Sequence, residues 1–139
     1  MINRYRILVL VFLSLTIIAS CKITTNPLTP DVPTIYGTWN WESSIGGFAG
    51  HILTPKSTGY MKQVRLYTSG VYEEYRNNEQ VLTSPFIIKD KVVGQQTYQL
   101  LLLSNFPGTE FYIKLQGRDT LLLSDPFVDG YQHTYRRQR

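Results

Sequence analysis

The fold is decided by residues 36–41, which read Tyr-Gly-Thr-Trp-Asn-Trp. Thr38, Trp39 and Trp41 are residue types that favour strands, and two indoles spaced two positions apart point to the same side of an extended chain. Gly37 lets a neighbouring segment approach closely. The stretch therefore predicts a first strand whose two tryptophans seal one end of a core.

From this stretch onward, short strand-forming runs alternate with turn signals. Asn77 and Asn78 form one such signal because both tolerate positive φ, Asp90-Lys91 is predicted as another, and Pro85 is expected to mark an edge, a bulge or a distortion. Short reversals between neighbouring strands predict an all-β antiparallel up-and-down barrel, which leaves no edge unpaired. We predict eight strands, at residues 36–44, 61–68, 71–76, 81–89, 97–104, 109–116, 120–124 and 131–137.

The motif Gly37-Thr38-Trp39 resembles the Gly-x-Trp signature that opens the first strand of lipocalins. In that family an arginine near the end of the last strand stacks on the tryptophan and closes the barrel floor, which implies this role for Arg136 or Arg137. Taken alone, the motif also fits any amphipathic strand. The glycine-rich stretch 46–50 and later turn residues, 54–60 and 129–131, resemble the small lipocalin-like lipoproteins of Bacteroidetes-type envelopes. The resemblance covers about residues 35 to 137.

The first twenty residues have the three-part pattern of a secretory signal. Arg4 and Arg6 precede an apolar run at residues 7–18, and two small residues follow. The run is shorter than the roughly 20 helical residues that span a bilayer. Residues 18–21, Ile-Ala-Ser-Cys, resemble a bacterial lipobox, which implies cleavage before Cys21 and its lipidation. The alternative is an ordinary signal peptide with a coincidental cysteine.

Residues 21–35 are predicted to be a tether, because prolines recur at every third position and favour an extended spacer. Lys22 follows the cysteine, where an Asp would resemble an inner-membrane retention signal, and no acidic cluster of the surface-export kind follows. We therefore expect a lipid-anchored protein of the outer membrane that faces the periplasm. Residues 36–139 are predicted to form the lipocalin-like barrel domain.

The composition favours one small globular domain. Removal of a 20-residue leader from 139 residues leaves 119, and removal of Arg4 and Arg6 from 14 basic residues leaves 12 against 10 acidic ones. This small excess of positive charge argues against a nucleic-acid partner. Cys21 is the chain's one cysteine, so an internal disulfide is excluded. We expect a monomer.

The chain offers little that resembles catalytic chemistry. His51 and His133 are too far apart in the sequence to suggest a metal site, and His133 is expected to be a hydrogen-bonded structural residue rather than a base or a ligand. The adjacent carboxylates of Glu73 and Glu74 face opposite sides of a strand. There is no Gly-x-Ser-x-Gly nucleophile elbow. We therefore predict no enzyme activity, no metal and no cofactor.

The sequence leaves two functions open. In the first, which the lipocalin resemblance implies, the barrel carries a small apolar ligand under a lid formed by residues 45–60. The lid would contribute Phe48, Ile52 and Leu53, and the cavity lining is predicted as Tyr67, Tyr75, Tyr98 and Phe111. In the second, a solid barrel engages another envelope protein in a scaffolding or inhibitory role. An apolar cavity of about 300 Å³ or more favours the first, and a filled core with an exposed apolar patch on the loops favours the second.

Overall fold

A computed structural model describes residues 34–139 of the chain. The predictions for the leader, for Cys21 and for nearly all of the tether lie outside these residues. The described part contains nine strands and one short helix. In chain order they are β1 (Gly37–Gly46), β2 (His51–Leu53), α2 (Pro55–Thr58), β3 (Lys62–Leu66), β4 (Val71–Arg76), β5 (Glu79–Val93), β6 (Gln96–Leu103), β7 (Glu110–Gln116), β8 (Thr120–Ser124) and β9 (Tyr131–Arg137).

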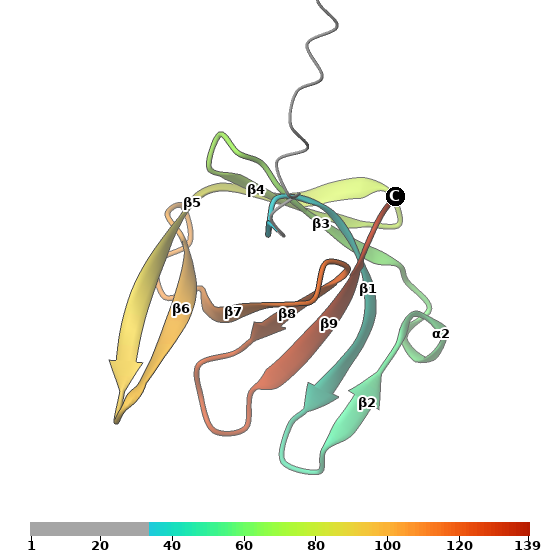
Figure 1. The fold of residues 1–139 in the computed structure, drawn as a ribbon. Coiled ribbons are helices and arrows are strands. Elements are labelled where there is room, and N and C mark those ends of the chain that lie inside the picture. Colours follow the sequence, from blue (N-terminus) through green and yellow to red (C-terminus); the bar gives the residue numbers. More distant parts are fainter. Residues whose placement is uncertain (1–33) are drawn as a thin grey trace, which may run out of the picture. The chain divides into compact units, whose positions relative to one another are not determined.

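The strands form a closed antiparallel barrel (Figure 1), which confirms the predicted fold class. Eight strands make the ring in the order β1-β3-β4-β5-β6-β7-β8-β9, and β9 pairs back onto β1. The closing ladder runs from Trp39 opposite Arg137 to Gly46 opposite Tyr131. The ninth strand, β2, lies outside the ring and pairs with the last three residues of β1.

Strand β1 contains an irregularity that decides which of its side chains enter the barrel. Trp39 and Trp41 are both buried, as their two-residue spacing predicts. The register against β9 shifts between Trp41 and Ser43, which marks a bulge. The extra residue turns Ser44 inward as well, and Ser44 is only 3% exposed.

Segment 45–60 differs from the predicted long lid loop, because it contains β2 and the one-turn helix α2. The helix forms because Pro55 begins it and Thr54 caps it, with the Thr54 hydroxyl accepting from the Ser57 N–H at 3.2 Å. Gly59, with φ of 75°, ends it. Thr54 and Ser57, three residues apart with Pro55 between them, form a capping box, which is a sequence pattern typical of a helix N-terminus.

Strand β5 is longer than predicted and continues through Asp90-Lys91, so the turn predicted there is wrong. The reversal falls at Gly94, whose φ of 64° a glycine adopts without strain. Pro85 lies where β5 changes partner: β4 pairs with β5 as far as Pro85, and β6 begins to pair at Phe86. Beyond this point the β5–β6 hairpin projects from the barrel (Figure 1).

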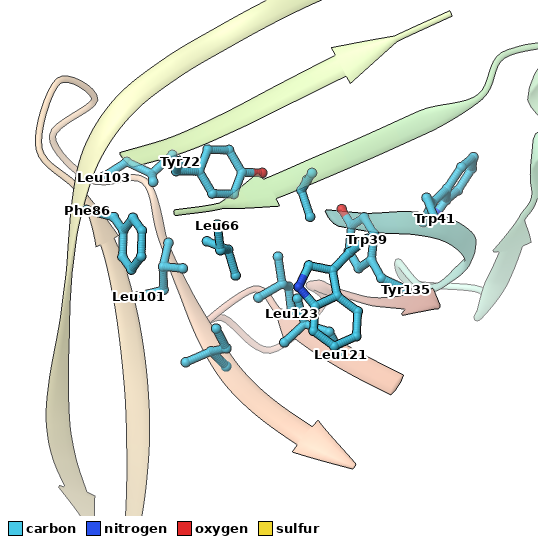
Figure 2. Packing of buried hydrophobic residues seen from close by; sticks show 12 residues of the cluster. Trp39, Trp41, Leu66, Tyr72, Phe86, Leu101, Leu103, Leu121, Leu123 and Tyr135 are labelled. Carbon is cyan, nitrogen blue, oxygen red and sulfur yellow. The ribbon is translucent and has the colours of Figure 1, made fainter. Parts of the chain in front are cut away.

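The interior of the barrel is filled by one cluster of twelve buried side chains (Figure 2). Every strand of the ring contributes at least one member, since inward residues alternate with outward ones. The members are Trp39, Trp41, Val64, Leu66, Tyr72, Phe86, Leu101, Leu103, Ile113, Leu121, Leu123 and Tyr135.

Candidate functional site

The barrel is closed at one end by Arg137, one of the two arginines implied by the lipocalin resemblance. Its guanidinium lies 4.1 Å from the centroid of the Trp39 ring. The guanidinium also donates to the carbonyl of Tyr36 at 2.9 Å, to the carbonyl of Arg118 at 2.8 Å and to that of Thr34. One planar cation thus ties the segment before β1 to the β7–β8 turn and to the tryptophan.

The other two residues predicted for closure have different roles. Arg136 faces outward and pairs with Glu42, with its Nε 3.1 Å from Oε1. Gly37 lies against the closing arginine, since a Cβ there would be 2.8 Å from an Arg137 nitrogen, and its φ of 135° favours glycine. The stacking position therefore belongs to Arg137.

The residues predicted for the lid lie on the β1–β2 hairpin, with Phe48 at its tip and Ile52 and Leu53 in β2. Phe48 is 98% exposed and Ile52 is 63% exposed. Leu53 packs against the edge of the core. Phe48 and Ile52 therefore extend into solvent, whereas Leu53 lies against the barrel.

The predicted lining residues are not gathered around a common space. Tyr67 and Tyr75 lie together on the outer surface, where both hydroxyls donate to the Glu73 carboxylate, at 2.8 Å and 2.9 Å. Tyr98 contacts the ring of Tyr112, which also faces outward. Phe111 does face inward and packs against the core.

The largest hollow that we describe has a volume of about 670 Å³ and lies beside the seam where β6 and β7 separate. The ladder between these strands ends at Gln99 opposite Ile113, and the first residues of β6 diverge from there. Because Leu121 and Leu123 face the core, the neighbouring lining residues Leu122 and Ser124 face outward. Ile113 and Leu115, which also line the hollow, pack with the core, so the hollow is an open cleft at the edge of the barrel wall with a partly polar lining.

Apolar side chains gather where two loops meet at the Gly46 end of β1. The N–H of Gly47 donates to the carbonyl of Asp129 at 3.2 Å, which ties the β1–β2 tip to the β8–β9 loop. Ile45 lies directly opposite Ile52 in the hairpin. We call the exposed apolar residues here the loop patch; they are Ile45, Phe48, Ile52, Phe127 and Val128, and Val128 is 100% exposed.

A charged cluster lies on the inner side of β3 and β4. The Lys62 amine is 3.6 Å from one oxygen of Glu74, and Arg76 Nε is 3.3 Å from the other. The Tyr72 hydroxyl also approaches the Glu74 carboxylate, at 3.5 Å. Burial lowers the pKa of Lys62, against the opposing effect of Glu74.

A series of hydrogen-bonded polar side chains links β1 to β9. The Trp41 indole donates to the Ser44 hydroxyl at 2.8 Å, and this hydroxyl lies 2.6 Å from Nδ1 of His133. Because Ser44 already accepts from the indole, we assign its proton as donated to Nδ1, which leaves the ring proton on Nε2, 3.9 Å from Asp125. Burial, followed by the positive charge of Lys62, lowers the pKa of His133 to about 4.

Ser44, His133 and Asp125 are the residue types of a hydrolase triad, but their setting differs from one. Ser44 is buried and its oxygen already accepts from the indole, so a substrate carbonyl has no approach to it. The hydrogen bond between Ser44 and His133 instead joins β1 to β9 beside the ladder that closes the barrel. Sequence reasoning placed His133 in a structural hydrogen bond but did not find its partner Ser44, 89 residues away.

Tyr135 is a further buried polar residue of β9. Its side chain is fully buried, and its hydroxyl has no hydrogen-bond partner among the described residues. The Lys62 amine lies 5.7 Å from the centroid of its ring. Burial raises the pKa of Tyr135 well above its usual range. A buried hydroxyl without a protein partner is rare in folded proteins.

Comparisons of the chain with protein-family models, with curated proteins and with solved structures found no match. Among residues 34–139 no helix is both long and apolar enough to cross a bilayer. The same part of the chain holds no group of three or more potential metal-binding side chains.

Proposed function

We propose that this chain is a lipid-anchored envelope protein whose barrel is a solid-core interaction module, with the loop patch as its contact surface for another envelope protein. The observation that carries the proposal is the exposure of Phe48 and Val128, at 98% and 100%, on two loops joined by a hydrogen bond. Apolar side chains gathered on adjoining loops are typical of protein interaction sites.

The position of the loop patch fits a tethered module. Thr34 and Tyr36 are held by Arg137 at the Gly37 end of β1, whereas the loop patch lies at the Gly46 end of the same strand. Figure 1 shows the two ends on opposite sides of the barrel. The loop patch therefore lies at the end of the barrel opposite the first described residues, where it is open to a partner protein.

The interior geometry favours this function over that of a carrier for a small apolar ligand. The barrel centre is occupied by the twelve-residue cluster, and charged side chains, Lys62 and Glu74, lie beside it. The residues proposed to line a ligand cavity are dispersed, with Tyr67 and Tyr75 on the outer surface. An apolar ligand needs a continuous apolar space, which this arrangement does not favour.

Native mass spectrometry of the protein extracted from its own envelope tests the proposal. We expect a stoichiometric protein complex from the natural chain and its loss from the double variant Phe48→Ser, Val128→Ser. Val92→Ser is the matched control, because Val92 is also exposed but lies on the separate β5–β6 hairpin. A small apolar molecule that stays bound to both chains, without any partner protein, would contradict the proposal.

A further inference from the structure

We propose that the seam between β6 and β7 binds an extended acidic peptide of a partner protein, which adds to the barrel wall as a further strand. This site contains no residue of the loop patch and does not depend on its role. The proposal rests on two strand edges that face each other without pairing, on the cleft between them and on the basic side chains at the outer side of that cleft.

The two strand edges are left open where β6 and β7 separate. Their ladder ends at Gln99 opposite Ile113, yet β6 begins three residues earlier and β7 continues for three residues more. Each extension is held on its other side, residues 96–98 by β5 and residues 114–116 by β8. Within residues 34–139 no strand pairs with either extension on the seam side. Backbone groups that point into the seam are therefore available to an added strand.

The cleft of about 670 Å³ lies in this seam. Its lining includes residues 97–99 of β6 and residues 112–115 of β7. Ile113 and Leu115 pack with the core, whereas Lys114 faces outward, so the cleft is bordered by both faces of the barrel wall. In Figure 1 the β5–β6 hairpin runs away from β7 at this point. A strand in the cleft would alternate its side chains between an apolar inner side and the outer surface.

The outer side of the seam is basic. Lys114 lines the cleft and is exposed. From β5 the Lys91 amine reaches toward β7 and lies 5.5 Å from the centroid of the Tyr112 ring, which also lines the cleft. None of the residues that line the cleft is acidic, and Asp90, the neighbour of Lys91, lies on the other face of β5. Carboxylates on the outward side of an added strand would therefore meet complementary charge.

The site thus specifies a pattern in the peptide. Apolar side chains at alternate positions pack toward Ile113 and Leu115. Acidic side chains at the intervening positions lie near Lys91 and Lys114. The peptide backbone pairs with the open edges of β6 and β7, as in other cases of strand addition. A small anion would meet the two lysines but would leave both edges unpaired, so a peptide satisfies more of the site.

Fluorescence anisotropy of the full-length chain with synthetic peptides tests the proposal. The probe is a short labelled peptide of alternating valine and glutamate. One matched peptide carries lysine in place of glutamate, and another carries methyl groups on its backbone nitrogens. We expect saturable binding of the glutamate probe and binding of the other two that is weaker by about tenfold or more. Failure of the glutamate probe to bind, or equal binding of the N-methylated peptide, would overturn strand addition.

Charge variants locate the binding site. Lys114→Gln should weaken binding of the glutamate probe by about threefold, the effect of one exposed ion pair. Lys56→Gln is the matched control, because Lys56 is also exposed but lies in α2, and it should bind as the natural chain does. The double variant Phe48→Ser, Val128→Ser should also bind normally. Loss of binding in this double variant, with Lys114→Gln unaffected, would place the peptide on the loop patch and overturn the proposal.

Hydrogen exchange measured by NMR shows whether the peptide pairs with both edges. Amides that face the seam, within residues 96–98 and 114–116, should exchange more slowly when the glutamate probe is bound. Amides of β2 should be unchanged. If the same seam amides are already protected in the peptide-free chain, and more so at higher protein concentration, a second copy of the chain occupies the seam and the proposal is wrong.

Discussion

Arg137 and Arg136 are adjacent in the sequence but differ in how much they stabilise the fold. Arg137 stacks on buried Trp39 and satisfies several carbonyls, whereas Arg136 makes an exposed ion pair with Glu42. We expect Arg137→Gln to lower the free energy of unfolding by about 2–3 kcal/mol, because a charge-assisted hydrogen bond and a cation–π contact each contribute about 1–2.

Arg136→Gln is the matched control, and it should cost less than about 1 kcal/mol, the usual contribution of an exposed ion pair. Urea denaturation of the two variants measures the difference. Equal losses would mean that Arg137 does not close the barrel end.

His133 makes stability depend on pH in a defined window. The unfolded side chain takes up a proton near its ordinary pKa of 6.5, whereas the folded one resists protonation until about pH 4. The free energy of unfolding should therefore fall as the pH drops from 6.5 to about 4, by at most about 3 kcal/mol from this residue, and level off below.

His133→Gln isolates this contribution, because glutamine keeps a polar contact for Ser44 but does not titrate. Between pH 7 and pH 4.5 the urea midpoint of the natural chain should fall more than that of the variant. His51→Gln is the control, and it should retain the full pH dependence. Parallel midpoints for the natural chain and His133→Gln would contradict the assignment.

At the scale of single elements, the close approach of β1 and β9 depends on Gly46. A Cβ at this position would lie 2.3 Å from the carbonyl oxygen of Gly130 and 2.7 Å from the Tyr131 Cα, both of them backbone atoms. Gly46→Ala should therefore separate the ends of the two strands and cost about 1–3 kcal/mol, the usual range for overpacking.

Gly50→Ala is the comparison, since its Cβ would meet no atom within 4 Å and only its φ of 63° is unfavourable. It should cost about 1 kcal/mol and leave the β1–β9 ladder unchanged. Hydrogen exchange of the Tyr131 and Gln132 amides distinguishes the two variants. Faster exchange in Gly50→Ala than in Gly46→Ala would refute the close approach.

The elements that followed local rules could be predicted, and those that depend on long-range pairing could not. Strand alternation placed Trp39, Trp41 and Phe111 inward, and Asn77 and Asn78 have the positive φ expected of them. The bulge in β1, which brings Ser44 to His133, has no local signature because it depends on the register with β9.

Some features of the candidate sites had sequence signals that were not used. Lys62 lies two positions before Val64 on the same face of β3, so alternation alone puts its charged side chain inside the barrel. The sequence did not predict the exposure of Phe127 and Val128. The conformation of their loop depends on the backbone hydrogen bond between Gly47 and Asp129, which are far apart in the sequence. The β1–β2 and β8–β9 loops come together only when the barrel closes.

At the scale of the whole molecule, the proposed lipid anchor decides where the barrel works. Cys21→Ala should release the protein into the soluble fraction, because a diacyl anchor holds a protein on a membrane and the loss of its attachment site removes it. Fractionation of cells that express each form measures the change. Lys22→Ala, which keeps the cysteine, should remain in the membrane fraction. A Cys21→Ala chain that stays membrane-bound would contradict the anchor.

The central claim is that the loop patch contacts a partner protein, and photo-crosslinking in the intact envelope tests it most directly. A photoreactive amino acid replaces Phe48 or Val128 in one set of chains and Val92 in the control. The account predicts one discrete crosslinked protein species from both loop positions and none from position 92. Crosslinks to lipid alone, or the same species from all three positions, would contradict it.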